Sequence, residues 1–200
     1  MTGILVVATR NEHKVREIRE LLPGLKPALR TLSDFPGAPD VEEDGSTLEE
    51  NAVKKARSAA SYCGVWAMAD DSGLFVDAIG GAPGVHSARY AGPGRSCQDN
   101  NLKPLSALSG LSPGKRGASF RCAIALASPS GMVITVEGRL DGAIAPAVRG
   151  EGGFGYDPLF VPAGASVTLA EMSSAEKNLI SHRSAAVRKI APYLAACRPQ

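Results

Sequence analysis

The sequence predicts a mixed α/β fold, formed by one domain of two closely joined lobes that spans residues 1–200. Three observations lead to this. Apolar, β-branched runs of strand length alternate along the chain with segments that have the apolar spacing of amphipathic helices. A length of 200 residues is typical of one domain with a sizeable core. Hydrophobic residues make up 44% and charged residues 21% of the chain, as in ordinary globular proteins.

The first predicted element is a buried strand. Ile4–Ala8 is a continuous apolar run, which is the pattern of a strand covered on both faces. The polar residues Thr9-Arg10-Asn11 interrupt it, and a helix with a regular apolar stripe then runs to Pro23-Gly24. A strand, a short turn and a helix in this order direct the amides of the helix N-terminus toward an anion.

A second helix and a second buried strand follow a loop-like segment at residues 33–46. Thr47-x-x-Glu50 fits a capping box and predicts a helix that ends at Gly64. The apolar run Val65–Ala69 predicts the strand. We interpret the next residues, Asp70-Asp71-Ser72-Gly73, as a turn at the end of this strand, before a short strand at Leu74–Ile79.

The middle of the chain predicts a loop, a helix and a hairpin. Gly80–Gly94 is rich in glycine and proline and predicts a long irregular loop. A weaker helix is expected over Ser96–Ser109. Two apolar runs, Ser119–Ala127 and Met132–Leu140, flank a Ser-Pro-Ser-Gly turn, so we expect a hairpin that contributes to a projecting lobe.

The last part of the chain predicts a second glycine-rich loop and two helices. The loop covers Glu151–Pro158 and leads into a short strand at Leu159–Val161. Ser173-x-x-Glu176 fits another capping box. The helix that it opens is expected to break at Ser181 or His182, before a final helix.

Composition excludes several classes of protein. A net charge of +2 is too weak to indicate binding to nucleic acid or to a membrane surface. The four cysteines, Cys63, Cys97, Cys122 and Cys197, are too widely spaced for a zinc site or a dense disulfide framework. We expect them to be reduced thiols in a cytoplasmic protein. The apolar run near the N-terminus is too short for a signal peptide or a membrane span.

The pair Asp70-Asp71 is the main candidate for metal chemistry. Two adjacent carboxylates repel each other, and a bound cation would relieve that repulsion. Magnesium usually keeps several waters and joins one or two carboxylates to substrate phosphates. One such water would be a nucleophile whose proton Asp71 accepts. The acidic run Glu42-Glu43-Asp44 offers further ligands. The alternatives are a polar turn for the first pair and favourable interaction with a helix dipole for the second.

Two other groups of residues suit a nucleotide. Thr9, Asn11 and Lys14 supply a hydroxyl, an amide and an ammonium for phosphate, although a helix cap beside a solvated lysine explains them equally. This segment is not a Walker loop, because it lacks the glycines and the Lys-Ser/Thr pair. Phe154-Gly155-Tyr156-Asp157 places two rings close together in a chain that is only 5% aromatic. These rings suit stacking on a base, or they anchor the loop to the core.

A cationic group near the C-terminal helices completes the candidates. Lys177 and the triplet Ser181-His182-Arg183 lie close together in the sequence. The guanidinium of Arg183 can bind a base carbonyl or a phosphate through two parallel hydrogen bonds. The alternative is a structural histidine beside a solvated lysine.

Taken together, these motifs closely resemble the inosine triphosphate pyrophosphatase family, also called the dITP/XTP or noncanonical purine nucleoside triphosphate pyrophosphatases. The match follows the family's order over nearly the whole chain. The matching motifs are Thr9-x-Asn11-x-x-Lys14-x-x-Glu17, Glu42-Glu43-x-Gly45-x-Thr47-x-x-Glu50-Asn51-Ala52, Ala69-Asp70-Asp71-Ser72-Gly73-Leu74, Gly81-Ala82-Pro83-Gly84-Val85-x-Ser87-Ala88-Arg89-Tyr90, Gly153-Phe154-Gly155-Tyr156-Asp157-Pro158 and Glu176-Lys177-x-x-Ile180-Ser181-His182-Arg183.

The resemblance implies a fold and an activity. The fold is an elongated α/β structure with a mixed central sheet flanked by helices, and the nucleotide binds in a cleft between two lobes. The activity is Mg²⁺-dependent hydrolysis of ITP, dITP and XTP between the α- and β-phosphates, by a water that attacks the α-phosphate. The products are the monophosphate and pyrophosphate, so the enzyme cleanses the nucleotide pool. Family members are usually homodimers.

The resemblance also implies roles for single residues. Asp71 is the general base and a metal ligand, and Glu42 is the second metal ligand. Glu42 and Glu43 are adjacent, so the choice between them rests on alignment alone. Arg10 is a departure from the family, since many relatives have glycine there. The substrate-binding residues are Thr9, Arg10, Asn11, Glu12, His13, Lys14, Ser72, Phe154, Gly155, Tyr156, Asp157, Lys177, His182 and Arg183.

Other functions stay open at this point. The nearest is a related pyrophosphatase that prefers pyrimidine or modified common triphosphates. Another is a nucleotide sensor without catalytic activity. A single-stranded nucleic-acid binder is disfavoured, because the chain has no basic stripe with interleaved aromatic residues. Within the favoured function, adenine is expected to be rejected because its six-amino group would leave donors such as Arg183 unpaired.

Overall fold

The computed structural model describes residues 3–25, 28–94 and 96–194. A mixed sheet of six strands in the order β2-β1-β3-β4-β5-β6 runs through the chain, together with five α-helices among these residues. β1 pairs in parallel with β2 and β3, whereas β5 and β6 are antiparallel. The predicted α/β class is therefore confirmed. The chain divides into two compact units, of which unit 1 comprises Met1–Asp71, Cys122–Gly138 and Arg183–Gln200, and unit 2 comprises Ser72–Arg121 and Arg139–His182.

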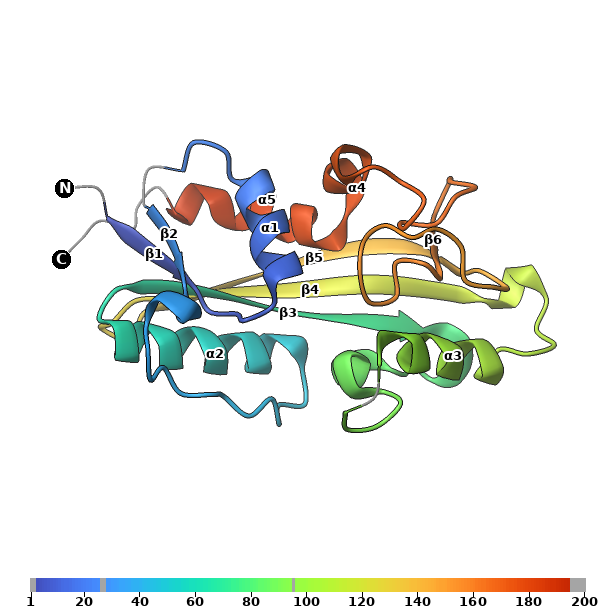
Figure 1. Ribbon diagram of the computed structural model, residues 1–200, viewed down its shortest axis with the longest axis horizontal. Coiled ribbons are helices and arrows are strands. Elements are labelled where there is room, and N and C mark those ends of the chain that lie inside the picture. Colours follow the sequence, from blue (N-terminus) through green and yellow to red (C-terminus); the bar gives the residue numbers. More distant parts are fainter. Residues whose placement is uncertain (1–2, 26–27, 95, 195–200) are drawn as a thin grey trace. The chain divides into compact units, whose positions relative to one another are not determined.

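Unit 1 is a layered structure in which helices cover both faces of the strands (Figure 1). Its elements are β1 (Ile4–Val7), α1 (Glu12–Leu21), β2 (Ala28–Thr31), the 3₁₀ turn η1 (Leu32–Asp34), α2 (Leu48–Cys63), most of α5 (His182–Leu194) and parts of β3 (Trp66–Val76), β4 (Gly117–Ala127) and β5 (Val133–Ile144). α1 and α5 cover one face, and α2 covers the other (Figure 1). Covering on both faces explains why the β1 sequence is apolar at consecutive positions.

The two faces of unit 1 are packed differently. On the first, large side chains from α1 and α5, such as Ile18 and Ile190, form a cluster with Leu5, Met68 and Ile124 of the strands. On the second, α2 buries mainly small residues at helical spacing, and the buried alanines are Ala52, Ala56, Ala59 and Ala60. Small side chains allow close approach of a helix to the sheet. The residues of α2 nearest its start are therefore held close to β3.

The ends of α2 confirm the predicted helix but correct its cap. Thr47 is the N-cap and its hydroxyl accepts a hydrogen bond from the Glu50 amide at 3.1 Å. Glu50 does not complete the predicted capping box, because its carboxylate accepts from the amide and hydroxyl of Ser46 instead. At the other end, Gly64 closes the helix in the left-handed conformation, with φ of 67°.

The predicted turn after Ala69 is wrong. β3 runs without a break from Trp66 to Val76, so Asp70-Asp71-Ser72-Gly73 lies inside the strand, and no separate strand covers Leu74–Ile79. Gly73 serves close packing rather than a reversal of the chain. A Cβ atom there would lie 2.4 Å from the carbonyl oxygen of Gly84, so only glycine fits at this contact within unit 2.

Unit 2 has its own core, around Leu74, Phe120, Leu159 and Phe160. Its further elements are the 3₁₀ turns η2 (Asp77–Ile79), η3 (Gly84–Arg89) and η4 (Pro113–Lys115), the helices α3 (Cys97–Ala107) and α4 (Ser174–Ile180), and β6 (Phe160–Pro162). The segment predicted as an irregular loop at Gly80–Gly94 therefore contains a 3₁₀ helix. The capping box at Ser173 and the break at Ser181 are confirmed.

The hairpin predicted from residue 119 to 140 is also present. Its strands β4 and β5 are neighbours in the sheet, and the Ser128 amide donates to the Met132 carbonyl at 2.9 Å across the turn. Residues 122–138 belong to unit 1, and the rest of both strands belongs to unit 2. The assignment of the hairpin to a projecting lobe stays a prediction.

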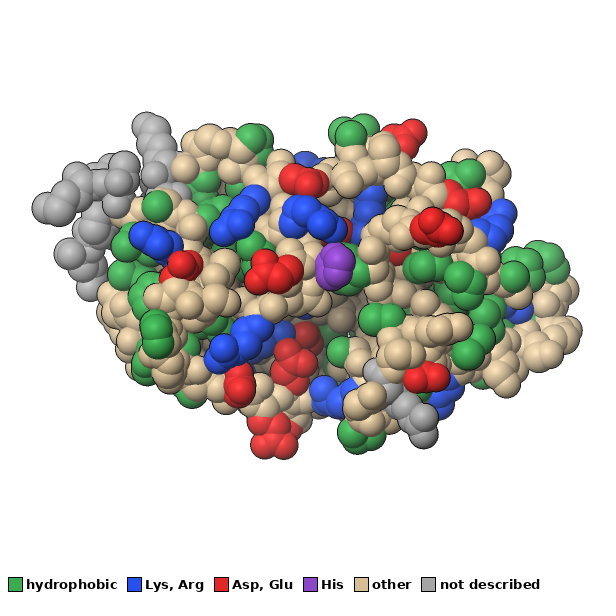
Figure 2. Space-filling model, viewed as in Figure 1, with side chains coloured by type: hydrophobic (Ala, Val, Ile, Leu, Met, Phe, Trp, Pro, Cys, Tyr) green, Lys and Arg blue, Asp and Glu red, His purple; other side chains and the backbone are tan. Residues whose placement is uncertain are grey.

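The surface carries charges of both signs. On the face drawn in Figure 2, acidic and basic side chains are interspersed, in line with the small net charge. None of the helices in the described part of the chain is long and apolar enough to cross a membrane. Cys63, Cys97 and Cys122 form no disulfide among the described residues, and Cys197 lies outside them.

Candidate functional site

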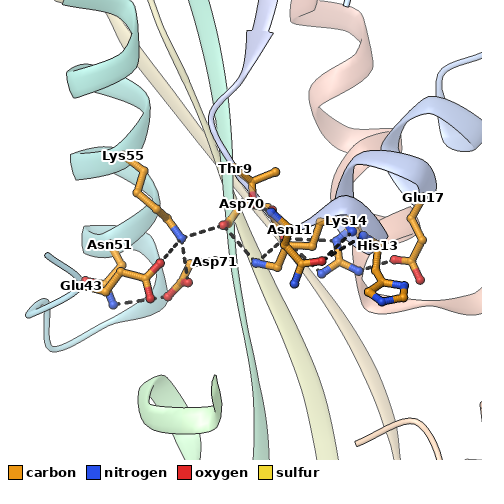
Figure 3. Close-up of polar contacts among 11 residues, drawn as sticks. Thr9, Asn11, His13, Lys14, Glu17, Glu43, Asn51, Lys55, Asp70 and Asp71 are labelled. Atoms are coloured by element: carbon orange, nitrogen blue, oxygen red, sulfur yellow. Dashed lines mark hydrogen bonds and ion pairs between the residues drawn. The ribbon is translucent and has the colours of Figure 1, made fainter. Parts of the chain in front are cut away.

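Asp70 and Asp71 point to opposite faces of β3, because successive side chains of a strand alternate. Figure 3 shows the consequence, with Asn51 and Lys55 of α2 on one side of the strand and Lys14 and Glu17 of α1 on the other. Their adjacency in the sequence suggested that one cation binds both carboxylates. The structure instead places them on opposite faces of the strand. Each has its own cationic partner.

Asp71 is held by two residues of α2 that lie one helical turn apart. Lys55 Nζ is 3.0 Å from Asp71 Oδ1, and Asn51 Nδ2 donates to Asp71 Oδ2 at 3.3 Å. Burial raises the pKa of the Asp71 carboxyl above its usual value of 3.8, because the opposing effect of Lys55 is partly offset by the nearby charge of Glu43. A raised pKa makes the carboxylate a better proton acceptor.

Lys55 makes the most contacts on the Asp71 side of β3, and it was not among the residues predicted from the sequence. Its ammonium contacts Glu43 Oε1 at 2.6 Å, Asp71 Oδ1 at 3.0 Å and the backbone oxygen of Asp70 at 2.9 Å (Figure 3). Burial alone would lower its pKa, but the surrounding acidic residues raise it, so Lys55 stays charged. One feature of the sequence could have indicated Lys55. It lies one helical turn after Asn51, on the same side of a helix with a predicted cap.

The structure distinguishes Glu42 from Glu43. Glu43 contacts Lys55 and so lies in the Asp71 cluster, whereas Glu42 is exposed. No group of three or more potential metal-binding side chains gathers among the described residues. Such a group is not required for magnesium, which takes most of its ligands from water and substrate phosphates. Two neighbouring carboxylates, Asp71 and Glu43, fit that mode of binding.

Asp70 is the centre of a buried ion-pair network on the other face of β3. Its Oδ2 atom is 3.1 Å from Lys14 Nζ and 3.1 Å from Nη2 of Arg183, and Arg183 also pairs with Glu17. Burial alone would raise the pKa of Asp70, but Lys14 and Arg183 hold it well below its usual range. These residues join α1, β3 and α5 within unit 1.

Arg183 is fully enclosed by this network. Its side chain is 2% exposed, and the neighbouring carboxylates raise its pKa further although burial opposes this. Its guanidinium contacts Asp70 and Glu17. This arrangement supports a role in fixing Asp70 and α1. Direct contact of Arg183 with a base stays a prediction.

The segment Thr9–Lys14 forms a capped helix start. Asn11 is the N-cap of α1, and its Oδ1 accepts from the amides of His13 and Lys14 at 3.0 and 3.2 Å. Thr9 Oγ1 accepts from the Asn11 amide at 3.1 Å. The helix-cap interpretation is thus confirmed for Asn11, and Thr9 supports this cap residue from outside the helix. The cap fixes the position of Lys14, which is not a solvated lysine but is partly buried against Asp70.

The other residues of this segment lie at the surface. Arg10 binds Asp40 through Nε at 3.0 Å and the carbonyl of Ala38 through Nη2 at 2.9 Å. It therefore holds the loop that contains these two residues. Glu12 is exposed, and His13 is exposed beside Arg16.

In unit 2, the loop Gly153–Asp157 surrounds a second ion pair. Asp157 Oδ2 lies 2.5 Å from Lys177 Nζ and accepts from the Phe154 amide at 2.8 Å. Lys177 Nζ is 4.9 Å from the centre of the Phe154 ring. The ring of Phe154 is partly exposed, whereas Tyr156 is buried and its hydroxyl donates to the Ser87 carbonyl at 2.8 Å. The core-anchoring interpretation is therefore confirmed for Tyr156, whereas base stacking by Phe154 stays a prediction.

Two more predicted site residues lie in unit 2. His182 is buried, and its ring stacks on Phe120 with the centroids 4.7 Å apart. Ser72 lies within β3 and is half-buried. The structure thus gathers part of the candidates in two groups, together with residues that were not predicted. In unit 1 the group consists of Lys14, Glu17, Glu43, Asn51, Lys55, Asp70, Asp71 and Arg183; in unit 2 it consists of Phe154, Tyr156, Asp157 and Lys177.

Comparisons with known proteins match the chain over nearly its full length. A family model described as the Ham1 family matches residues 5–193. A dITP/XTP pyrophosphatase from Geobacter sulfurreducens is 52% identical over 190 residues, which is 95% of this chain and 96% of that protein. A protein of the same description from Desulforamulus reducens is 50% identical over 185 residues and 92% of each chain.

Solved structures agree with these matches. A HAM1 protein from Coxiella burnetii superimposes with a TM-score of 0.88 at 41% identity, covering 97% of this chain and 99% of that chain. A nucleoside-triphosphatase/dITP/XTP pyrophosphatase from Mycobacterium abscessus has a TM-score of 0.76 at 42% identity, with coverages of 95% and 98%.

Proposed function

Because the chain belongs to the Ham1 family, we propose that it is a dITP/XTP pyrophosphatase, which hydrolyses noncanonical purine nucleoside triphosphates. The family resemblance drawn from the sequence motifs is thereby confirmed. The products are the monophosphate and pyrophosphate. One structural observation supports the proposal most directly. Asp71, a buried carboxylate with a raised pKa, forms an ion pair with the ammonium of Lys55.

Binding of the phosphates falls to unit 1. Lys14 and Lys55 are both partly buried, and each is positioned by a carboxylate of β3. A triphosphate is a polyanion, and its hydrolysis depends mainly on positioning and on neutralisation of the charge that develops. Two ammonium groups held in place in this way supply part of that charge. The amides at the start of α1 add a favourable dipole.

A divalent cation, for which we propose Mg²⁺, would supply further positive charge and a bound water of lowered pKa. The carboxylates that fit it are Asp71 and one of the adjacent pair Glu42 and Glu43. Sequence alignment suggested Glu42, but the geometry favours Glu43, which already lies in the Asp71 cluster. Asp71 accepts the proton of the attacking water, and its burial makes it the stronger base for this step.

Binding of the base falls to unit 2. The partly exposed ring of Phe154 offers a stacking face. Asp157 and Lys177 beside it are buried and paired with each other, and they belong to the same proposed set of base-binding residues. Ser72, His182 and Arg183 belong to the same proposed set of nucleotide-binding residues. Binding of the nucleotide in a cleft between two lobes, and assembly as a homodimer, are further parts of this proposal.

A substrate panel tests the function. Pyrophosphate release is measured with ITP, dITP, XTP, dTTP and UTP, each with and without Mg²⁺. Faster turnover of the three noncanonical purines, dependent on the metal, is the expected result. Faster turnover of dTTP or UTP would instead support a pyrimidine-preferring relative. Nucleotide binding without any release of pyrophosphate would identify a sensor.

A further inference from the structure

The loop Gly153–Asp157 is built from residues with unusual backbone freedom. Gly153 and Gly155 both adopt positive φ, at 69° and 61°. Glycine reaches these conformations without strain, but it also leaves the loop many alternatives. The side of the loop before Gly155 is tied down, because Asp157 accepts from the Phe154 amide. Tyr156 is held by its hydroxyl, which donates to the Ser87 carbonyl, and the Gly155 carbonyl has a further anchor.

Asn101 of α3 is that anchor. Its Nδ2 donates to the carbonyl oxygen of Gly155 at 3.0 Å, across 54 residues of sequence. α3 is itself well ordered at its start, since Ser96 and Asp99 form a capping box. The donor therefore projects from a fixed helix toward a glycine-rich loop, and both belong to unit 2.

The burial of Asn101 indicates that its side chain is retained for this hydrogen bond. The residue is 6% exposed, and its Oδ1 atom has no hydrogen-bond partner within the part of the chain that the structure describes. A buried amide oxygen without a partner is unfavourable, and leucine, which has the same branching and the same number of side-chain heavy atoms, would avoid it. The presence of asparagine here is explained if the donor to Gly155 outweighs that loss.

The neighbouring residue shows that the effect is specific to one loop. Asn100 accepts from the Ala91 amide at 2.7 Å and donates to the Ala88 carbonyl at 3.2 Å, so it holds the end of η3 instead. Asn100 and Asn101 are equally buried, at 6% exposure each. They form a matched pair that differs in the loop each one anchors.

We infer that Asn101 is a positioning residue that fixes the Phe154 ring in the orientation that binds the base. This inference rests on the proposed function, because it takes the loop Gly153–Asp157 as the base-binding element. The proposed function assigns the phosphates to residues of unit 1, whereas Asn101 belongs to unit 2. Its loss should therefore weaken recognition of the base and leave the phosphate chemistry in place.

The test compares Asn101→Leu with Asn100→Leu in the full-length protein. For Asn101→Leu we expect KM for ITP to rise about three- to tenfold with kcat nearly unchanged, as for loss of one hydrogen bond. Binding of IMP should weaken by a similar factor, whereas inhibition by inorganic pyrophosphate should not change. Asn100→Leu should leave KM for ITP and IMP binding close to those of the unmodified protein. If Asn101→Leu does not fold, Asn101→Ala removes the donor with no added bulk.

The outcomes separate the inference from the function. Unchanged KM and IMP affinity in a folded Asn101 variant would overturn the inference, while the unmodified enzyme still hydrolyses ITP. Equal losses of IMP and pyrophosphate binding would also overturn it, because they would indicate a general structural role. Absence of ITP hydrolysis by the unmodified protein would instead refute the proposed function.

Discussion

Lys55 and Asp71 form an ion pair, 3.0 Å between Nζ and Oδ1, that joins helix α2 to the middle of strand β3. The pair places the proposed general base beside a proposed phosphate-binding cation. Neither partner is free to move alone, because Lys55 also contacts Glu43 and Asp71 also accepts from Asn51. The following predictions begin from this arrangement.

Removal of the Lys55 ammonium should impair catalysis strongly. For Lys55→Met we expect kcat/KM for ITP to fall roughly a hundredfold or more, because a preorganised charge near the phosphates is lost. Pyrophosphate release is the measurement. Lys54→Met is the matched control, since Lys54 lies on the same helix but pairs with Asp44. Equal losses in the two variants would argue against a specific role for Lys55.

Asp71→Asn should abolish proton transfer while it preserves the shape of the site. We expect kcat to fall about 10²- to 10⁴-fold, the usual contribution of a general base. Binding of the nucleotide, followed by calorimetry, should largely survive. Retention of more than a tenth of the activity would show that another group accepts the proton.

Glu43 and Glu42 can be distinguished by their effect on the metal. We expect Glu43→Gln to raise the Mg²⁺ concentration that gives half-maximal activity about tenfold or more, because a carboxylate ligand is lost. Glu42→Gln, an exposed neighbour with the same change in charge, should have a small effect. The opposite ranking would support the ligand that sequence alignment suggested. The assay is a magnesium titration at a fixed ITP concentration.

Asp70 should contribute to stability rather than to proton transfer. Its pKa in the folded protein is depressed below the unfolded value of 3.8. Its contribution is therefore complete above the unfolded pKa and is lost as the pH falls toward the folded pKa. We expect Asp70→Asn to lower the free energy of unfolding by about 3 kcal/mol at neutral pH, since it leaves Lys14 and Arg183 without a buried counterion.

The same variant should also change the pH dependence of stability. Between about pH 5 and about pH 3, the unmodified protein should lose more stability than Asp70→Asn, which cannot titrate at this position. Urea unfolding with EDTA present measures both curves without interference from metal. Parallel curves would show that the acid sensitivity arises from other carboxyl groups.

The sequence predicted the elements of the fold better than their joins. The α/β class, the helix starts at Thr47 and Ser173 and the hairpin follow from local patterns that tertiary contacts reinforce. The turn at Asp70–Gly73 was wrong because polar residues and a glycine usually end a strand. Here the acids are neutralised by Lys55 and Lys14, and the glycine admits the backbone of Gly84, so β3 continues.

The residues of the candidate site could be predicted from the sequence only where they stand in local motifs. Asp71, Lys14 and Lys177 stand in short motifs, so their chemistry is visible in the sequence. Lys55 was missed because its contacts are with residues at positions 43 and 71, which only the fold brings together. The enclosure of Arg183 by Glu17 and Asp70 could not be anticipated either, since these three residues are far apart in the chain.

The alternation along β3 imposes an odd-even rule on this part of the chain. Insertion or deletion of a single residue between Gly64 and Asp70 would shift the register by one and exchange the faces of every side chain that follows. The carboxylate that meets Lys55 would then point toward Lys14, and the reverse. A length change of two residues would restore the faces, but it would move each carboxylate about 6.6 Å along the strand and away from its lysine. The ion pairs of Asp70 and Asp71 therefore depend on the length of this segment as well as on the charges of the two residues.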